Sequence, residues 1–210
     1  MVIHFFLLGL ARMLLYAPAY GLFLTDHSAN RLPLVYISVS ILATLLSVLY
    51  LRAAARVAFP KLMALNLGTV ILLTLASRGA LAVGGSWATF SLPIVNELVY
   101  VLVNLAFWAL AARLFDARTG KRLFGLLIAA KQLSEIVGGL LTPALASSIG
   151  SENLLFVSAG ASSVAAAVLV VIVRRFPGPL RDPEEADGSP GAHTAWRGLF
   201  RSRYVVLMVA

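Results

Sequence analysis

The chain has 210 residues, of which 60% are hydrophobic and only 12% are charged, and its formal net charge at pH 7 is +8. A soluble domain normally carries about a quarter charged residues, and so short a chain cannot bury this much apolar surface in one core. The lack of cysteine excludes disulfides and thiolate metal sites. The composition therefore predicts a membrane protein whose apolar solvent is the bilayer.

Six apolar runs are long enough to cross the membrane, which takes about 20 mainly apolar residues in a helix. In chain order they cover residues 3–25, 34–51, 62–83, 89–114, 123–149 and 154–173. Short polar breaks separate them, at residues 26–33, 52–61, 84–86, 116–122 and 150–153. We expect an all-α fold, a polytopic bundle of six transmembrane helices over residues 1–176.

The sequence after the sixth run changes character. Residues 177–203 form a long segment whose middle is rich in proline, glycine and acidic residues, and we expect a disordered cytoplasmic central loop there. A seventh apolar run covers only residues 204–210, which is too short to cross a bilayer. We interpret it as the truncated start of a seventh transmembrane helix, and the chain as a fragment.

The basic residues predict the orientation, because cytoplasmic loops carry an excess of lysine and arginine. Three lie in residues 52–61, four in 113–122 and six in 174–203, which makes 13 of the 17 basic residues. The intervening breaks and their flanks hold only Arg31 and Arg78. We therefore expect the N-terminus in the cytoplasm. Because the positive charge follows the topology, nucleic acid is not an expected partner.

Four charged residues inside the predicted spans have no part in this topology signal. They are Arg12, Glu97, Lys131 and Glu135. A charge at the centre of a membrane helix costs at least about 2.5–3.5 kcal/mol on insertion scales, so such residues normally face the bundle interior and serve a function.

Helical spacing places these charges on faces with other polar groups, since residues three, four and seven apart share a face. The faces are Arg12, Tyr16 and Tyr20 on the first span, Glu97, Tyr100 and Asn104 on the fourth, and Lys131 and Glu135 on the fifth. The other three spans have uncharged interiors. We expect the first, fourth and fifth helices to surround a wet cavity in which these eight residues bind a solute.

More ordinary explanations stay open for three of the charges. Arg12 lies about nine residues from the cytoplasmic end of its span, and its long side chain could reach toward the interface. Lys131 and Glu135 could be a structural pair that neutralises itself. Glu97 has no local partner in the sequence, which is compatible with a proton-carrying role.

Other residue types point away from catalysis. The three histidines, His4, His27 and His193, are scattered, and we expect no metal site or cofactor. No nucleophile–base pair, phosphate-binding loop or pair of neighbouring carboxylates is recognisable, so the sequence does not predict an enzyme. Gly125, Gly138 and Gly139 are expected to let neighbouring helices approach closely.

The topology resembles the N-terminal half of a major facilitator superfamily transporter, which has two six-helix halves joined by a long cytoplasmic loop. In that superfamily the first, fourth and fifth helices of a half contribute to the central cavity, while the third and sixth lie outside. The resemblance implies secondary transport, with a C-terminal half as the missing partner.

A narrower resemblance lies between Asn96 and Gly139. The segments FWALA (107–111), FD (115–116), KRLFG (121–125) and GG (138–139) look like those of the ATP:ADP antiporter branch, whose members are nucleotide transporters. Its many bacterial relatives imply the inner (plasma) membrane of a bacterium. Members usually have small or amide residues where this chain has Lys131, so the nucleotide-binding charges of the branch are not carried over.

We expect a secondary active transporter half that lies in the lipid bilayer and moves a small polar, anionic solute. Arg12 and Lys131 would attract the anion, and Glu97 and Glu135 would balance charge or carry a proton. For a nucleotide substrate, the three tyrosines of the polar faces would stack on the base. The alternatives are a non-transporting sensor or scaffold with the same fold, and an intramembrane enzyme.

Overall fold

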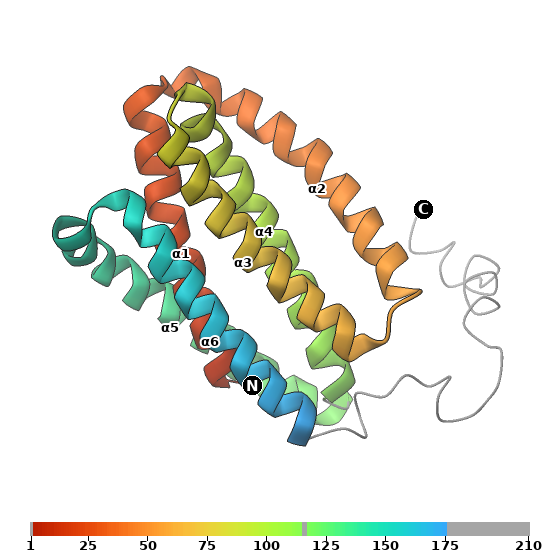
Figure 1. Ribbon diagram of the computed structural model, residues 1–210. Coiled ribbons are helices and arrows are strands. Elements are labelled where there is room, and N and C mark those ends of the chain that lie inside the picture. The colour runs from red at the N-terminus through yellow and green to blue at the C-terminus, as the bar shows by residue number, and fades with distance from the viewer. Residues whose placement is uncertain (1, 115–116, 176–210) are drawn as a thin grey trace. The chain divides into compact units, whose positions relative to one another are not determined.

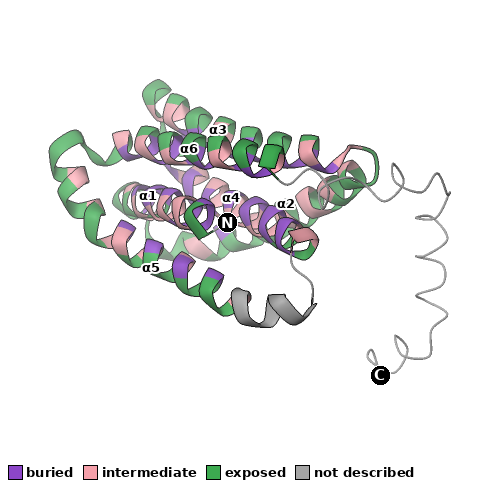
Figure 2. Ribbon diagram, turned by 90° about the horizontal axis from the view of Figure 1, so that it is seen from below, coloured by how far each residue is buried: buried purple, intermediate pink, exposed green. Residues whose placement is uncertain are grey.

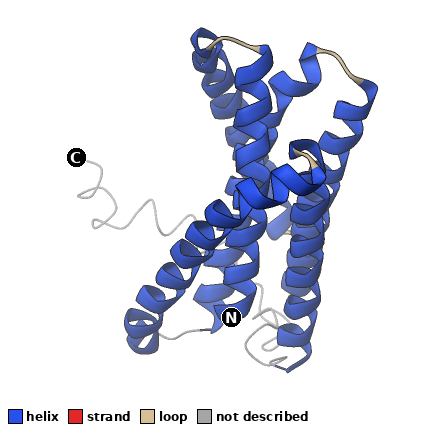
Figure 3. Ribbon diagram, turned by 90° about the vertical axis from the view of Figure 1, so that its left-hand side faces the viewer, coloured by secondary structure: helices blue, strands red, loops and turns tan. Residues whose placement is uncertain are grey.

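The computed structural model describes residues 2–114 and 117–175, with side chains described for residues 2–114 and 124–175. The chain divides into two units, Met1–Leu180 and Arg181–Ala210. The predicted central loop (177–203) and seventh helix (204–210) lie outside the described residues. Within the described part, all regular structure is helical (Figure 3).

Six long helices and two short 3₁₀ helices make up the described part. In chain order they are α1 (Val2–Asp26), η1 (Ala29–Arg31), α2 (Leu32–Ala54), α3 (Phe59–Val83), α4 (Ser86–Leu114), α5 (Ala117–Ile149), η2 (Ser151–Asn153) and α6 (Leu154–Arg175). All six long helices are long and apolar enough to cross a membrane. The predicted all-α bundle is confirmed, and the chain is a multi-pass membrane protein.

The predicted breaks are longer than the connections in the structure, most of all at residues 116–122. Residues 116–122 were expected to form a loop, but α5 is helical from Ala117. The segment from Ala117 to Arg122 is polar, yet four of its six residues are alanine, arginine or lysine, which are good helix formers. Its polarity therefore marks where the apolar part of the span begins, and the helix itself begins earlier.

Glycine makes two of the other breaks possible. Gly84 and Gly85, between α3 and α4, have φ angles of 81° and 99°, and Gly150, between α5 and η2, has a φ of 88°. Side chains disfavour this left-handed region, and glycine enters it at little cost. The helices therefore end at these positions for a conformational reason as well as through a change in hydropathy.

The long helices alternate in direction along the chain (Figure 1). The start of α1, the α2–α3 connection, the end of α4 and the end of α6 lie at one end of the bundle (Figure 1). This end carries the basic residues Arg52, Arg56, Lys61, Arg113 and Arg174. The folded chain thus gathers the positive charge of separate loops at a single end.

Helix α1 is the centre of the packing. It packs against α4, α5 and α6, while α3 packs against α4 and α6 (Figure 2). Helix α2 packs mainly against α4, contacts α3 only slightly, and has Val35 as its one buried residue. Most of α2 is consequently a peripheral surface suited to lipid.

Buried polar side chains tie α1 to α6. The Nδ1 of His4 lies 2.9 Å from the carbonyl oxygen of Ala165. About two helical turns earlier on α6, Ser158 donates a 2.7 Å hydrogen bond to the carbonyl oxygen of Ala11. Both bonds lie away from water, where an unmade hydrogen bond is costly, so they fix α6 against α1.

Small residues bring α1 and α5 together. A Cβ atom on Gly138 would lie 2.8 Å from the Cβ of Met13, and one on Gly9 would overlap the hydroxyl of Ser134. The predicted close approach at Gly138 is confirmed. The same role is not seen for Gly125, where nothing lies within 4 Å of an added Cβ.

Candidate solute site at the α1–α4–α5 face

Two cations share one carboxylate where α1 meets α5. Arg12 on α1 donates from Nη1 to Oε1 of Glu135 on α5 at 2.9 Å, and Lys131 Nζ lies 3.5 Å from the same oxygen. The Arg12 and Glu135 side chains are 17% and 20% exposed. Lys131 and Glu135 pair as their spacing predicted, but they are not an isolated pair, because Glu135 also binds Arg12. The guanidinium of Arg12 turns to α5, which contradicts the alternative that it extends to the interface.

Helix α4 joins this cluster through Tyr100. The Cζ of Arg12 lies 4.2 Å from the centre of the Tyr100 ring, and Nζ of Lys131 lies 5.1 Å from it. A cation within about 6 Å of an aromatic ring is attracted to the negative face of the ring. One tyrosine from α4 therefore contacts the cations of both other helices.

Glu97 lies in a separate set of contacts. Its Oε1 accepts hydrogen bonds from the Tyr20 hydroxyl at 3.1 Å and from Nδ2 of Asn96 at 3.0 Å. The expectation that Glu97 has no local partner is therefore wrong. Asn96 was missed because it precedes Glu97 by one residue and is about 100° away around the helix. An amide next to a carboxylate within an apolar span was the available signal.

Tyr16 and Tyr20 connect the two sets. Their ring centres are 4.7 Å apart, and the Tyr16 ring centre is 6.0 Å from Cζ of Arg12. Tyr16 is 37% exposed, so this part of the site lies open at the bundle surface. The rings lie along α1 between the cation cluster and the Glu97 carboxylate.

Asn104 is placed differently from the other seven predicted site residues. Its Nδ2 donates a 2.7 Å hydrogen bond to the carbonyl oxygen of Tyr100, one turn back on the same helix. The structure thus brings seven of the eight residues together across three helices. For Asn104 it shows a bond within α4 and not a contact with the charges.

The charge balance of the site depends on Glu97. Arg12, Lys131 and Glu135 together carry a net charge of +1 when all three are ionised. The four charges balance only if Glu97 is ionised too. In addition, Nε of Arg12 is buried with no hydrogen-bond partner among the described residues, so the guanidinium is not fully satisfied.

A small cavity lies beside the site, between α1 and α5. It has a volume of about 250 Å³, and Ala17 and Gly21 of α1 and Thr142 and Ala146 of α5 are among its lining residues. It begins about two turns along α5 from Glu135. None of the charged site residues is among those that line this cavity, so it is not the wet cavity predicted around the charges. The charged side chains lie instead on a partly exposed face of the bundle.

The two described histidines, His4 and His27, contact backbone carbonyl oxygens of other helices. His4 bonds to α6, and Nε2 of His27 lies 2.9 Å from the carbonyl oxygen of Ser86, at the start of α4. No group of three or more histidine, aspartate or glutamate side chains that could hold a metal occurs among the described residues.

Comparisons of the chain with protein-family models, with curated proteins and with solved structures find no match. The contacts of its described residues define a multi-pass, all-α membrane bundle with a cluster of charged and aromatic side chains between α1, α4 and α5.

Proposed function

We propose that the chain is the N-terminal half of a secondary active transporter that moves a small polar, anionic solute. The observation that carries this proposal is the shared carboxylate: Arg12 and Lys131 both contact a single oxygen of Glu135. A purely structural pair needs one cation for each carboxylate, because uncompensated charge is costly in a membrane. An entering anion would supply the missing negative charge.

Glu97 would couple the solute to charge or proton movement. Its carboxylate is held by the neutral groups of Tyr20 and Asn96, apart from the Arg12–Glu135 pair. A proton on Glu97 would leave the site with a net positive charge and favour the anion. Loss of that proton would restore neutrality without a solute.

The resemblance to the major facilitator superfamily supplies the architecture of the proposal. A second six-helix half would pack over the open face near Tyr16, and the two halves would rock around the site. The resemblance to the ATP:ADP antiporter branch makes a nucleotide a candidate solute, moved by exchange. Tyr16, Tyr20 and Tyr100 would then stack on the base.

The basic end of the bundle supports the proposed location. We place this end, with the N-terminus, in the cytoplasm, because it carries Arg52, Arg56 and Lys61 among others. The bacterial inner membrane follows from the resemblance to bacterial relatives of the branch.

Uptake of labelled anionic solutes, nucleotides included, by proteoliposomes containing the full-length protein tests the proposal. Arg12→Ala should slow uptake by about 30-fold or more, because loss of one partner from a buried charge pair costs about 2–5 kcal/mol. Glu97→Gln keeps a hydrogen-bond acceptor for Tyr20 but removes the ionisable group, and should abolish the dependence of uptake on a proton gradient.

Arg56→Gln is the matched control, because Arg56 is an exposed basic residue outside the site. It should transport as the unmodified protein does. If Arg12→Ala and Glu97→Gln both transport at the unmodified rate, the assignment of the site is wrong. If the full-length protein is folded but moves none of the anions, the sensor or scaffold alternative is favoured.

A further inference from the structure

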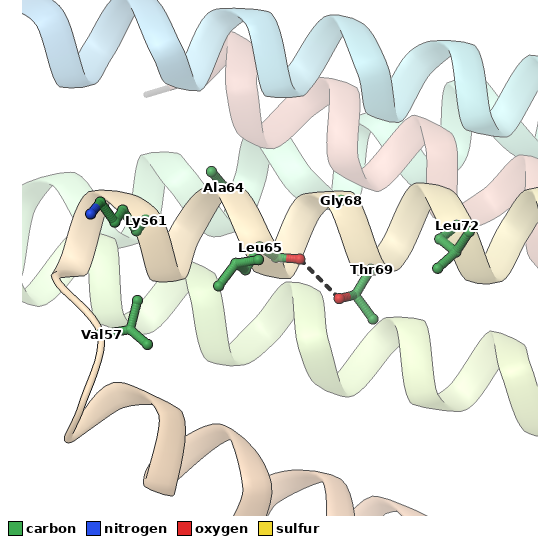
Figure 4. Close-up of a pocket in the computed structure, with 7 residues that line it drawn as sticks. All are labelled: Val57, Lys61, Ala64, Leu65, Gly68, Thr69 and Leu72. Atoms are coloured by element: carbon green, nitrogen blue, oxygen red, sulfur yellow. Dashed lines mark hydrogen bonds between the residues drawn. The ribbon is translucent and has the colours of Figure 1, made fainter.

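A groove runs along the outer side of α3, away from the charged site. It has a volume of about 610 Å³, begins at Val57 and Lys61, and continues past Gly68 to Leu72 (Figure 4). Figure 4 also shows α2 diverging from α3 on this side, in keeping with the slight contact between these helices. The structure leaves this surface open because α2 packs on α4 instead.

The chemistry of the groove changes along its length. Lys61 lies in the first turn of α3 at the basic end of the bundle, Arg56 lies in the α2–α3 connection just before Val57, and Arg52 lies in the last turn of α2. Beyond Lys61 the lining is apolar except for Thr69, whose hydroxyl donates to the carbonyl oxygen of Leu65 at 2.9 Å (Figure 4). The groove thus has one cation, Lys61, at its basic end and no unsatisfied hydroxyl further along α3.

The length of the groove matches one leaflet of a bilayer. Lys61 and Leu72 are eleven residues apart on a helix, a rise of about 16 Å, and half of the hydrocarbon core is about 15 Å thick. Helix α3 itself continues to Val83. A transmembrane helix of a partner would need an apolar surface across both leaflets, so the groove fits a lipid chain better.

We propose that this groove binds one anionic phospholipid of the leaflet at the basic end, with one of its two acyl chains along α3 and its phosphate beside Lys61. Charge complementarity selects the headgroup, because basic residues next to a membrane attract anionic lipids. The bound chain would fill the space that α2 leaves beside α3. This site is independent of the proposed transport function.

Native mass spectrometry of the full chain in mild detergent tests the proposal, with phosphatidylglycerol and phosphatidylcholine of identical acyl chains as probes. The unmodified protein should retain phosphatidylglycerol preferentially. Gly68→Leu should reduce retention of both lipids by about fivefold or more. An added Cβ at Gly68 has nothing within 4 Å, so the larger side chain occupies the groove without displacing the protein.

Gly160→Leu is the matched control, because Gly160 on α6 is equally open, and it should bind lipid as the unmodified protein does. Lys61→Gln should reduce the preference for phosphatidylglycerol by about fivefold, the equivalent of the roughly 1 kcal/mol that a basic residue gains near an anionic surface, and should keep acyl-chain binding. Arg174→Gln, at the same end on α6, should leave the preference unchanged.

Two results would overturn the proposal. The first is that the unmodified protein retains phosphatidylglycerol and phosphatidylcholine equally, and that Lys61→Gln does so too. The second is unchanged phosphatidylglycerol retention in a folded Gly68→Leu protein, and altered self-association of that variant would then assign the groove to a protein partner. If Gly68→Leu does not fold, the lipid preference of Lys61→Gln decides the question.

Discussion

At the scale of single residues, the informative feature is one oxygen atom, Oε1 of Glu135. It accepts from Arg12 and lies within ion-pair distance of Lys131. All three side chains are about four-fifths buried, so water screens these interactions only weakly. Removing the carboxylate would leave two neighbouring cations facing each other within the membrane.

Glu135→Gln should therefore destabilise the bundle by about 3 kcal/mol or more, the usual cost of removing one partner from a buried ion pair. Unfolding of the purified protein in detergent, followed by circular dichroism against temperature and denaturant, measures the change.

Glu152→Gln is the control for this prediction. Glu152 is 51% exposed and its pair with Arg78 is longer, at 3.6 Å, and exposed ion pairs contribute at most about 1 kcal/mol. Equal stability of the Glu135→Gln and Glu152→Gln proteins would show that the shared ion pair does not form.

At the scale of elements, the close packing of α1 on α5 holds the two cations near each other. Gly138 and Gly9 allow this approach, because a Cβ on either would meet a side chain of the opposite helix. Separation of the two helices would lengthen the contact between Arg12 and Glu135. The glycines and the charged site are thus linked through the same helix pair.

Gly138→Ala should destabilise the protein by about 1–3 kcal/mol, the usual cost of overpacking a tight interface. The added Cβ would lie 2.8 Å from the Cβ of Met13, which is fixed to the backbone of α1. Thermal unfolding in detergent measures the effect.

Gly139→Ala is the neighbouring control. An added Cβ there lies 3.5 Å from the terminal methyl of Met13, an ordinary contact. Alanine also favours the helix over glycine by up to about 1 kcal/mol, so this protein should be as stable as the unmodified one or slightly more stable. The account of the interface fails if the two variants unfold alike.

Helical periodicity explains which elements and contacts could be predicted. The spacing of Arg12, Tyr16 and Tyr20 placed them on one face because the helix itself sets that geometry. The partners across helices could not be predicted, since Arg12 and Glu135 are 123 positions apart in the chain. Hydropathy also failed to predict the start of α5. It marks the apolar part of a helix that contacts lipid, and α5 begins earlier, at Ala117, with a polar turn.

At the scale of the whole molecule, the orientation that we propose rests on the alternating helices and the basic end (Figure 1). The chain contains no cysteine, so single cysteines can be introduced without a prior deletion. Arg56→Cys, at the basic end, should react with a membrane-impermeant maleimide only in permeabilised cells. Glu152→Cys, between α5 and α6, should react in intact cells, and the reverse pattern would contradict the orientation.

A solute site at the α1–α4–α5 face requires that this face meets water, while the outer surface of α2 meets lipid. The most direct measurement is the reaction of Tyr16→Cys and Leu45→Cys with a water-soluble maleimide in proteoliposomes. Tyr16 is 37% exposed beside Arg12, and Leu45 is 56% exposed on α2. We predict rapid labelling of Tyr16→Cys and little labelling of Leu45→Cys, because maleimide reacts with thiolate, which forms only where water reaches. Equal labelling of the two, or labelling of Leu45→Cys alone, would contradict the account.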